Sequence, residues 1–171
     1  MSLEQVSARN VSFQGAELPL VQLADCRFEA GDFASCTLDK AYMRRVELIG
    51  CRLLGATLAE ADLRDVLFAR CNANLAHFWN TRFRAVRFEH CTLHEASFDG
   101  ADLTGVVFYK CDLSGADLRN TRLKGADLRG SSLAGIKINS NDVAGAVIDP
   151  IQALELIQLL GVVVRAEDAG T

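Results

Sequence analysis

The sequence contains no run of 18 apolar residues, so a helix that crosses a membrane is not expected. Its first ten residues, MSLEQVSARN, also lack the apolar core of a secretory signal. We therefore expect a cytoplasmic protein.

Neither sign of charge is in large excess. The chain of 171 residues carries 18 Lys and Arg against 22 Asp and Glu, a net charge of −4. Direct binding of nucleic acid normally needs a basic surface, so it is not expected. Half of the residues are apolar, which favours one folded domain over a disordered chain.

Motifs for metal binding or catalysis are missing as well. Six cysteines are present, but no two have the CxxC spacing. His90 and His94 are four residues apart, which places them about 13 Å apart on an extended chain, too far to share a metal. We predict no enzyme activity, no catalytic residues, no metal, no cofactor and no small-molecule substrate.

What the sequence does contain is a repeat of five residues. Of the thirty positions 3, 8, 13 and onward to 148, 24 are Leu or Phe. All nine Phe lie in this phase, and all six Cys lie two residues before one of its positions. The regularity indicates a repeat architecture that extends from about residue 3 to 148.

The period predicts one short extended side and one corner per unit. Residues two apart on an extended segment point the same way, so the small residue and the Leu or Phe both face inward. Ten of the 13 glycines hold the last place of a unit, where the chain must turn.

Four sides close a square coil of twenty residues. Stacked coils place like residues above one another in an all-β quadrilateral β-helix of about seven coils, roughly 35 Å long. The predicted core residues that repeat at this spacing are Cys51, Cys71, Cys91, Cys111, Phe68, Phe88 and Phe108.

Stretches such as GADLRGSSLAG and CDLSGADLRN resemble those of the pentapeptide-repeat proteins. The resemblance implies a right-handed quadrilateral β-helix. The Qnr and MfpA quinolone-resistance members of this family are dimeric rods that bind DNA gyrase and topoisomerase IV and are thought to imitate duplex DNA. Because the repeat here has no interrupting loop, the chain is more similar to the MfpA type.

The five-residue phase stops after residue 149, so we divide the chain into a β-helix, 1–149, and a C-terminal element, 150–171. Asp149 and Pro150 predict the start of a helix and Gly161 its end, with Gln152, Glu155 and Gln158 as a solvent-facing stripe. Residues 161–164 are predicted to form a short strand. The element would cap the last coil and form a homodimer. The predicted interface consists of Ile151, Leu154, Ile157, Leu160, Val162 and Val164.

Two features of the outer surface are candidates for binding a partner protein. One acidic face is predicted from five residues, which would otherwise form an ordinary solvated surface: Glu17, Asp39, Glu60, Asp99 and Asp117. Trp79 is a second candidate because it should project outward. On another face, Asp62, Arg82, Asp102, Arg122 and Asp142 should form a charge ladder across the coils.

Two functions remain open from the sequence. The first is a DNA-mimicking protein that binds a type II topoisomerase, modulating it or conferring quinolone resistance. The second is a non-catalytic scaffold with an unrelated protein partner.

Overall fold

The computed structural model describes residues 1–159, 161–163 and 165, and it confirms the predicted right-handed β-helix. Residues twenty apart pair in parallel along four columns, one for each side of a square coil. We number the walls by their first paired residues: the first wall from Ser2, the second from Ser7, the third from Ser12 and the fourth from Glu17.

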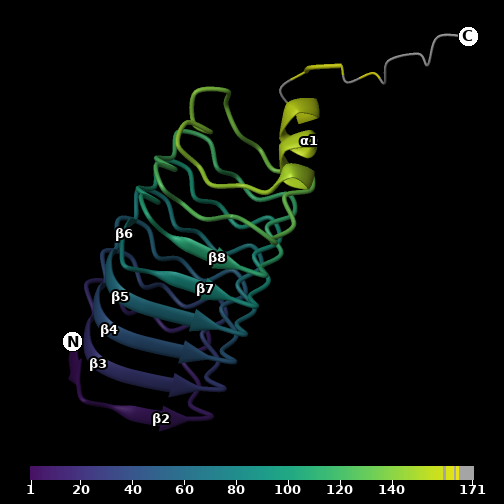
Figure 1. Cartoon of the computed structure of the whole chain (residues 1–171). Helices are drawn as coiled ribbons and strands as arrows, with labels where there is room; N and C mark the ends of the chain where they lie inside the picture. The colour runs from purple at the N-terminus through teal and green to yellow at the C-terminus, as the bar shows by residue number, and fades with distance from the viewer. Residues whose placement is uncertain (160, 164, 166–171) are drawn as a thin grey trace, which may run out of the picture.

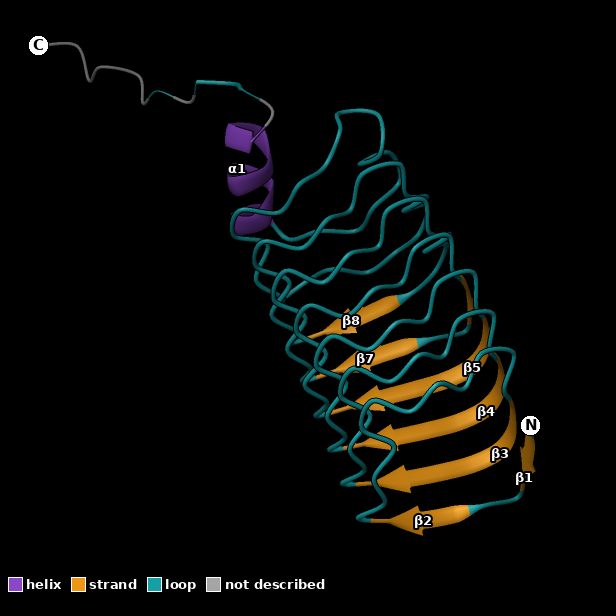
Figure 2. Ribbon diagram, turned by 180° about the vertical axis from the view of Figure 1, so that it is seen from behind, coloured by secondary structure: helices purple, strands orange, loops and turns teal. Residues whose placement is uncertain are grey.

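Regular strands are confined to the first and second walls, where they stack into one sheet (Figures 1 and 2). The sheet follows the order β1-β3-β4-β5-β7-β8, with β2 paired to β3 and β6 paired to β5. The strands are β1 (Ser2–Glu4), β2 (Ser7–Arg9), β3 (Gln22–Glu29), β4 (Tyr42–Ile49), β5 (Asp62–Ala69), β6 (Arg82–Arg84), β7 (Arg87–Glu89) and β8 (Val107–Tyr109).

These strands account for about five turns of the solenoid, fewer than the seven coils expected. Isolated bridges extend the same pairing, and on the second wall it reaches Val147 through Asp127. The expected seven coils are therefore reached only when sides that are paired by isolated bridges are counted together with the strands. In the last coil, residues 140–145 form a turn, so Asp142 has left the column that the sequence predicted for it.

The corners adopt a left-handed backbone conformation. All ten glycines at the last place of a unit have a positive φ, between 61° and 80°, as their placement predicted. Eighteen of the described residues other than glycine do so too, among them Leu20 and Leu75. Residues other than glycine rarely adopt this backbone conformation. The stacking of one coil on the next must therefore supply the free energy that holds these corners.

The interior is a continuous stack of small and large apolar side chains. Phe68 and Phe88 lie with ring centroids 4.6 Å apart and nearly parallel, and Phe88 and Phe108 follow at 5.1 Å. All seven residues expected in the core are at most 4% exposed.

The cysteines contribute hydrogen bonds as well as volume. The thiols of Cys71, Cys91 and Cys111 each donate to the carbonyl oxygen of the residue 23 positions earlier, at 3.2–3.3 Å. Thr81 does the same with its hydroxyl, 2.6 Å from Leu58 O. All six cysteines are free and buried, and burial raises the pKa of the Cys36 thiol to about 11.

The column that was predicted to form a charge ladder does so only in part. Asp62 pairs with Arg64 on its own strand, at 2.8 Å, rather than with Arg82 in the next coil. Of that column, only Asp102 and Arg122 form an ion pair, at 3.7 Å. Residues two apart on an extended side point the same way, so a partner on the same side is within reach.

The helix α1 (Pro150–Leu159) lies over the end of the last coil (Figure 1). Asp149 Oδ1 accepts hydrogen bonds from the amides of Ile151 and Gln152, and Gln152 Oε1 accepts one from Asp149 N. This reciprocal arrangement is a capping box. No helix of the described residues is long and apolar enough to cross a membrane.

The prediction of a solvent-facing stripe on α1 was wrong at Gln152, which is 3% exposed. Its Nε2 donates to Leu128 O and Ser131 O, at 2.6 and 2.7 Å. The last coil has no further coil to accept or donate its backbone hydrogen bonds, so a buried amide satisfies two of its carbonyls. Residues 161–163 form no strand, and Val164 lies outside the described residues.

Replacing Phe88 by Ala should lower the free energy of unfolding by about 3–5 kcal/mol, because it opens a cavity between two stacked rings. Urea unfolding followed by circular dichroism measures the change. Tyr109→Ala, at an aromatic residue that is 44% exposed, is the control and should cost no more than about 0.5 kcal/mol. Equal losses for the two variants would contradict the stacked core.

Candidate partner-binding wall

All of the sequence-predicted surface residues lie on the fourth wall and its corner. Glu17 and Asp117 belong to the paired column that also contains His77 and Ser97. The remaining candidates, Asp39, Glu60, Trp79 and Asp99, lie two or three places further along their coils, at the corner that leads to the first wall. Asp39, Trp79 and Asp99 are spaced by multiples of twenty, so the coil length alone places Trp79 in one column with two of the acidic residues.

Three carboxylates of this wall have no ion-pair partner among the described residues: Glu17, Asp39 and Asp99. Asp39 Oδ1 accepts a hydrogen bond from Ala59 N at 3.0 Å, and Asp99 Oδ1 accepts one from Asn120 Nδ2 at 2.7 Å. These contacts hold both carboxylates in place without neutralising them.

The other two acidic candidates are neutralised in part. Glu60 lies 3.6 Å from Lys40 Nζ, where both side chains are more than half exposed. Asp117 accepts two hydrogen bonds from the Arg119 guanidinium, at 2.9 and 2.6 Å. The Arg119 hydrogen bond is the main reason that the pKa of Asp117 is lowered from its usual value.

The second wall, on the opposite side of the coil, is charged but self-compensated. Glu29 and Glu47 both contact Arg27, Glu89 contacts Arg87, and Asp127 contacts Arg129. The fourth wall thus differs from the second in the number of carboxylates left free to meet a positive partner.

Trp79 lies on the fourth wall and is fixed at both ends of its side chain. Its indole Nε1 donates to Ser97 Oγ at 2.6 Å, and its ring centroid lies 4.5 Å from that of His77. The side chain nevertheless remains 43% exposed. No sequence signal pointed to His77 and Ser97, because neither belongs to the inward positions of the repeat.

Two buried polar atoms of the described chain lack a hydrogen-bond partner, and both belong to this wall. They are Thr57 Oγ1 and His77 Nδ1, on residues that pair with each other across adjacent coils. His77 lies beneath the indole, so the centre of the wall is held by packing more than by polar contacts.

The predicted dimer residues divide between two environments. Ile151, Leu154 and Val162 are exposed by 73, 52 and 53%, whereas Ile157 is half-buried against the last coil. Leu160 and Val164 lie outside the described residues.

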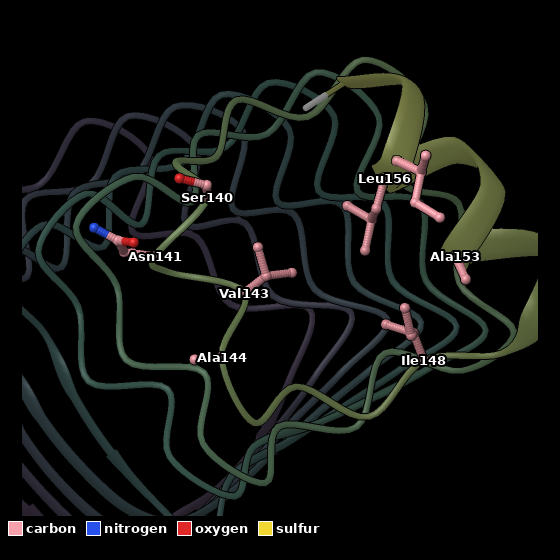
Figure 3. Close-up of a pocket in the computed structure, with 8 residues that line it drawn as sticks. Ser140, Asn141, Val143, Ala144, Ile148, Ala153 and Leu156 are labelled. Carbon is pink, nitrogen blue, oxygen red and sulfur yellow. The ribbon is translucent and has the colours of Figure 1, made fainter. Parts of the chain in front are cut away.

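An apolar hollow of about 500 Å³ opens between the last coil and α1. Val143 and Ile148 line it from the coil, and Ala153 and Leu156 line it from α1 (Figure 3). The five-residue repeat does not predict this hollow, because the hollow depends on how α1 packs against the turn at 140–145.

Within the described residues, no group of three or more His, Cys, Asp or Glu is arranged to hold a metal ion. Thiols at the inward positions and carboxylates at the outward positions lie on opposite sides of the chain, so they cannot meet.

Family comparison identifies the class of protein. The sequence profile described as "Pentapeptide repeat region" matches residues 21–98 and, in an overlapping placement, 41–118. The two placements differ by twenty residues, which is one coil. The chain belongs to the pentapeptide-repeat proteins.

Solved structures of the same class align over most of the chain. QnrB1, a plasmid-mediated fluoroquinolone resistance protein, is 19% identical, and the match covers 91% of this chain and 100% of that one, with a TM-score of 0.45. Rfr23 from the cyanobacterium Cyanothece is 18% identical, with coverages of 86 and 91% and a TM-score of 0.38. No curated protein sequence matches the chain.

Replacing Asp117 by Asn should remove a pH-dependent contribution to stability. The folded-state pKa is lowered, so the contribution is complete above the unfolded value of about 3.9 and is lost as pH falls through the folded pKa. We expect the variant to be less stable by about 0.5 kcal/mol at pH 7, since solvent screens the pair. Urea unfolding should show this difference at pH 7 and none near pH 2. A difference that persists unchanged at pH 2 would contradict the ionic origin.

Proposed function

We propose that this protein is a cytoplasmic, non-catalytic ligand of a type II topoisomerase, DNA gyrase or topoisomerase IV. It would occupy the enzyme's DNA-binding surface as a DNA-shaped competitor and so modulate the enzyme or lower quinolone action. The observation that carries this proposal is the acidic fourth wall on a rod whose pairing is continuous over seven coil-to-coil steps on the second wall.

The rod's dimensions support such a role. Coils are spaced by about 4.8 Å, so the stack is roughly 35 Å long, close to ten base pairs of duplex DNA. The fold is stiffened by backbone hydrogen bonds between every pair of coils, for example Leu58 N to His77 O at 2.7 Å. A stiff surface loses little conformational entropy on binding.

The charge of the fourth wall supports a weaker imitation of DNA. Five acidic residues are opposed by Lys40, Arg119 and Lys137, which leaves a net charge of about −2 on this wall, far below the one charge per about 1.7 Å of DNA. Charge of this size favours encounter with a basic surface and its orientation more than it contributes affinity.

The purified protein should inhibit DNA supercoiling by gyrase at tens of micromolar or below. It should also reduce the DNA cleavage that ciprofloxacin stabilises. A supercoiling assay and a cleavage assay, each with and without the drug, measure both effects. No inhibition and no protection would leave the scaffold function, with an unrelated partner.

The same assay locates the binding wall. Asp39→Asn with Asp99→Asn removes two free carboxylates from the fourth wall, and we expect the inhibitory concentration to rise at least threefold. Asn retains the Oδ1 that accepts each of the two hydrogen bonds, so the fold should be preserved. Glu4→Gln with Asp65→Asn removes the same charge from the first wall and should change little.

We also propose that two copies associate through the C-terminal end. Ile151 and Leu154, three residues apart on α1, and Val162 after it all expose apolar side chains at this end of the rod. A second copy related by a two-fold axis would cover these side chains with its own equivalents. The capping role of Gln152 and Leu156 uses the other side of α1 and is compatible with such an interface.

Light scattering tests the dimer. The chain of 18.6 kDa should show twice its mass, and Leu154→Asp should return it to the mass of one chain. Glu155→Gln, at an exposed position of the same helix, should leave the mass unchanged. A single-chain mass for the unmodified protein at 50 micromolar would rule out this association.

A further inference from the structure

Trp79 presents a flat aromatic surface to solvent in an otherwise polar wall. One side of the indole packs against His77, at 4.5 Å between centroids, and its N–H is engaged by Ser97 Oγ. The residue is nevertheless 43% exposed, so part of the indole is available to a partner. The residue is held in place before any partner arrives.

The coils on either side of Trp79 each carry an acidic residue at this corner. Glu60 N donates to Trp79 O at 2.7 Å, and Asn80 N donates to Asp99 O at 3.0 Å, so Glu60 and Asp99 lie in the coils on either side. Ala59 occupies the position of Trp79 in the preceding coil and presents only a methyl group. Ala59 therefore leaves the indole open on that side. The two carboxylates lie in the neighbouring coils, and that of Glu60 is 3.6 Å from Lys40 Nζ.

This arrangement has the chemistry of a site for a planar cation. A guanidinium group can stack on an indole face and donate hydrogen bonds to a carboxylate at its edge at the same time. A lysine ammonium is compact, strongly hydrated and not planar, so it matches this pair of contacts less well. Asp99 accepts a side-chain hydrogen bond from the neutral amide of Asn120 and has remaining acceptor capacity.

We propose that Trp79, with Asp99 and Glu60, forms a subsite for one arginine side chain of a protein partner. The proposal rests on the proposed function only in taking the fourth wall as the wall that binds. It identifies the anchor within that wall and the residue type that the partner supplies.

Trp79 is the only tryptophan of the chain, so its fluorescence reports directly on this site. We would titrate the full-length protein at low ionic strength with tetra-arginine and, separately, with tetra-lysine peptide. Tetra-arginine should change the emission saturably and bind at least threefold more tightly than tetra-lysine. Equal affinities would overturn the assignment to arginine and leave nonspecific attraction of cations to the wall.

Variants then separate the contribution of the indole to peptide binding from that of the acidic surface as a whole. With labelled tetra-arginine followed by anisotropy, Trp79→Ala should weaken binding at least threefold and Asp99→Asn about twofold. Tyr109→Ala is the matched control, because Tyr109 is 44% exposed but lies on the second wall, with Lys110 Nζ 5.2 Å from its ring centroid. Equal affinities for Trp79→Ala and Tyr109→Ala would overturn the proposal.

Trp79→Phe tests whether weaker binding by Trp79→Ala results from loss of the fold. It retains an aromatic face, so it should bind with intermediate affinity while its thermal midpoint stays close to that of the unmodified protein. The peptide measurements do not involve gyrase. A protein that binds tetra-arginine through Trp79 but leaves supercoiling unaffected would retain this subsite and lose only the topoisomerase as partner.

Discussion

The backbone hydrogen bonds that hold residues twenty apart in register are the constraint on which the structure depends. They fix the coil length, and the coil length decides which side chains share a column on the inside and a wall on the outside. The left-handed corners at residues such as Leu20 and Leu75 are tolerated because two coils hold each side in register. Fold and surface therefore follow from one periodicity, since neither the core nor the charge pattern can shift without breaking these bonds.

The surface follows from the same geometry in a less regular way. Outward side chains can pair along a side, as Asp117 does with Arg119, or across coils, as Lys40 does with Glu60. Which partner is chosen depends on side-chain length and neighbours. The free carboxylates Asp39 and Asp99 are the outcome of that competition, and they distinguish the fourth wall from the self-compensated second wall.

Sequence periodicity predicted the coil, its inward ladders and the glycine corners, because each depends on backbone spacing alone. It also placed the start of α1, where Asp149 and Pro150 act locally. It was wrong about Gln152, whose burial depends on the unpaired carbonyls of Leu128 and Ser131 in the last coil. It likewise missed His77 beneath Trp79, since contacts between outward side chains leave no periodic signal.

Each coil contacts only the coils before and after it, so the rod tolerates change in steps of its own period. Insertion or loss of twenty residues would lengthen or shorten the stack and leave every later side chain on its wall. Loss of five would turn everything downstream by a quarter revolution and carry later residues onto a different wall. Changes in length by multiples of twenty residues therefore preserve a binding surface. Changes by other multiples of five place its two parts on different walls.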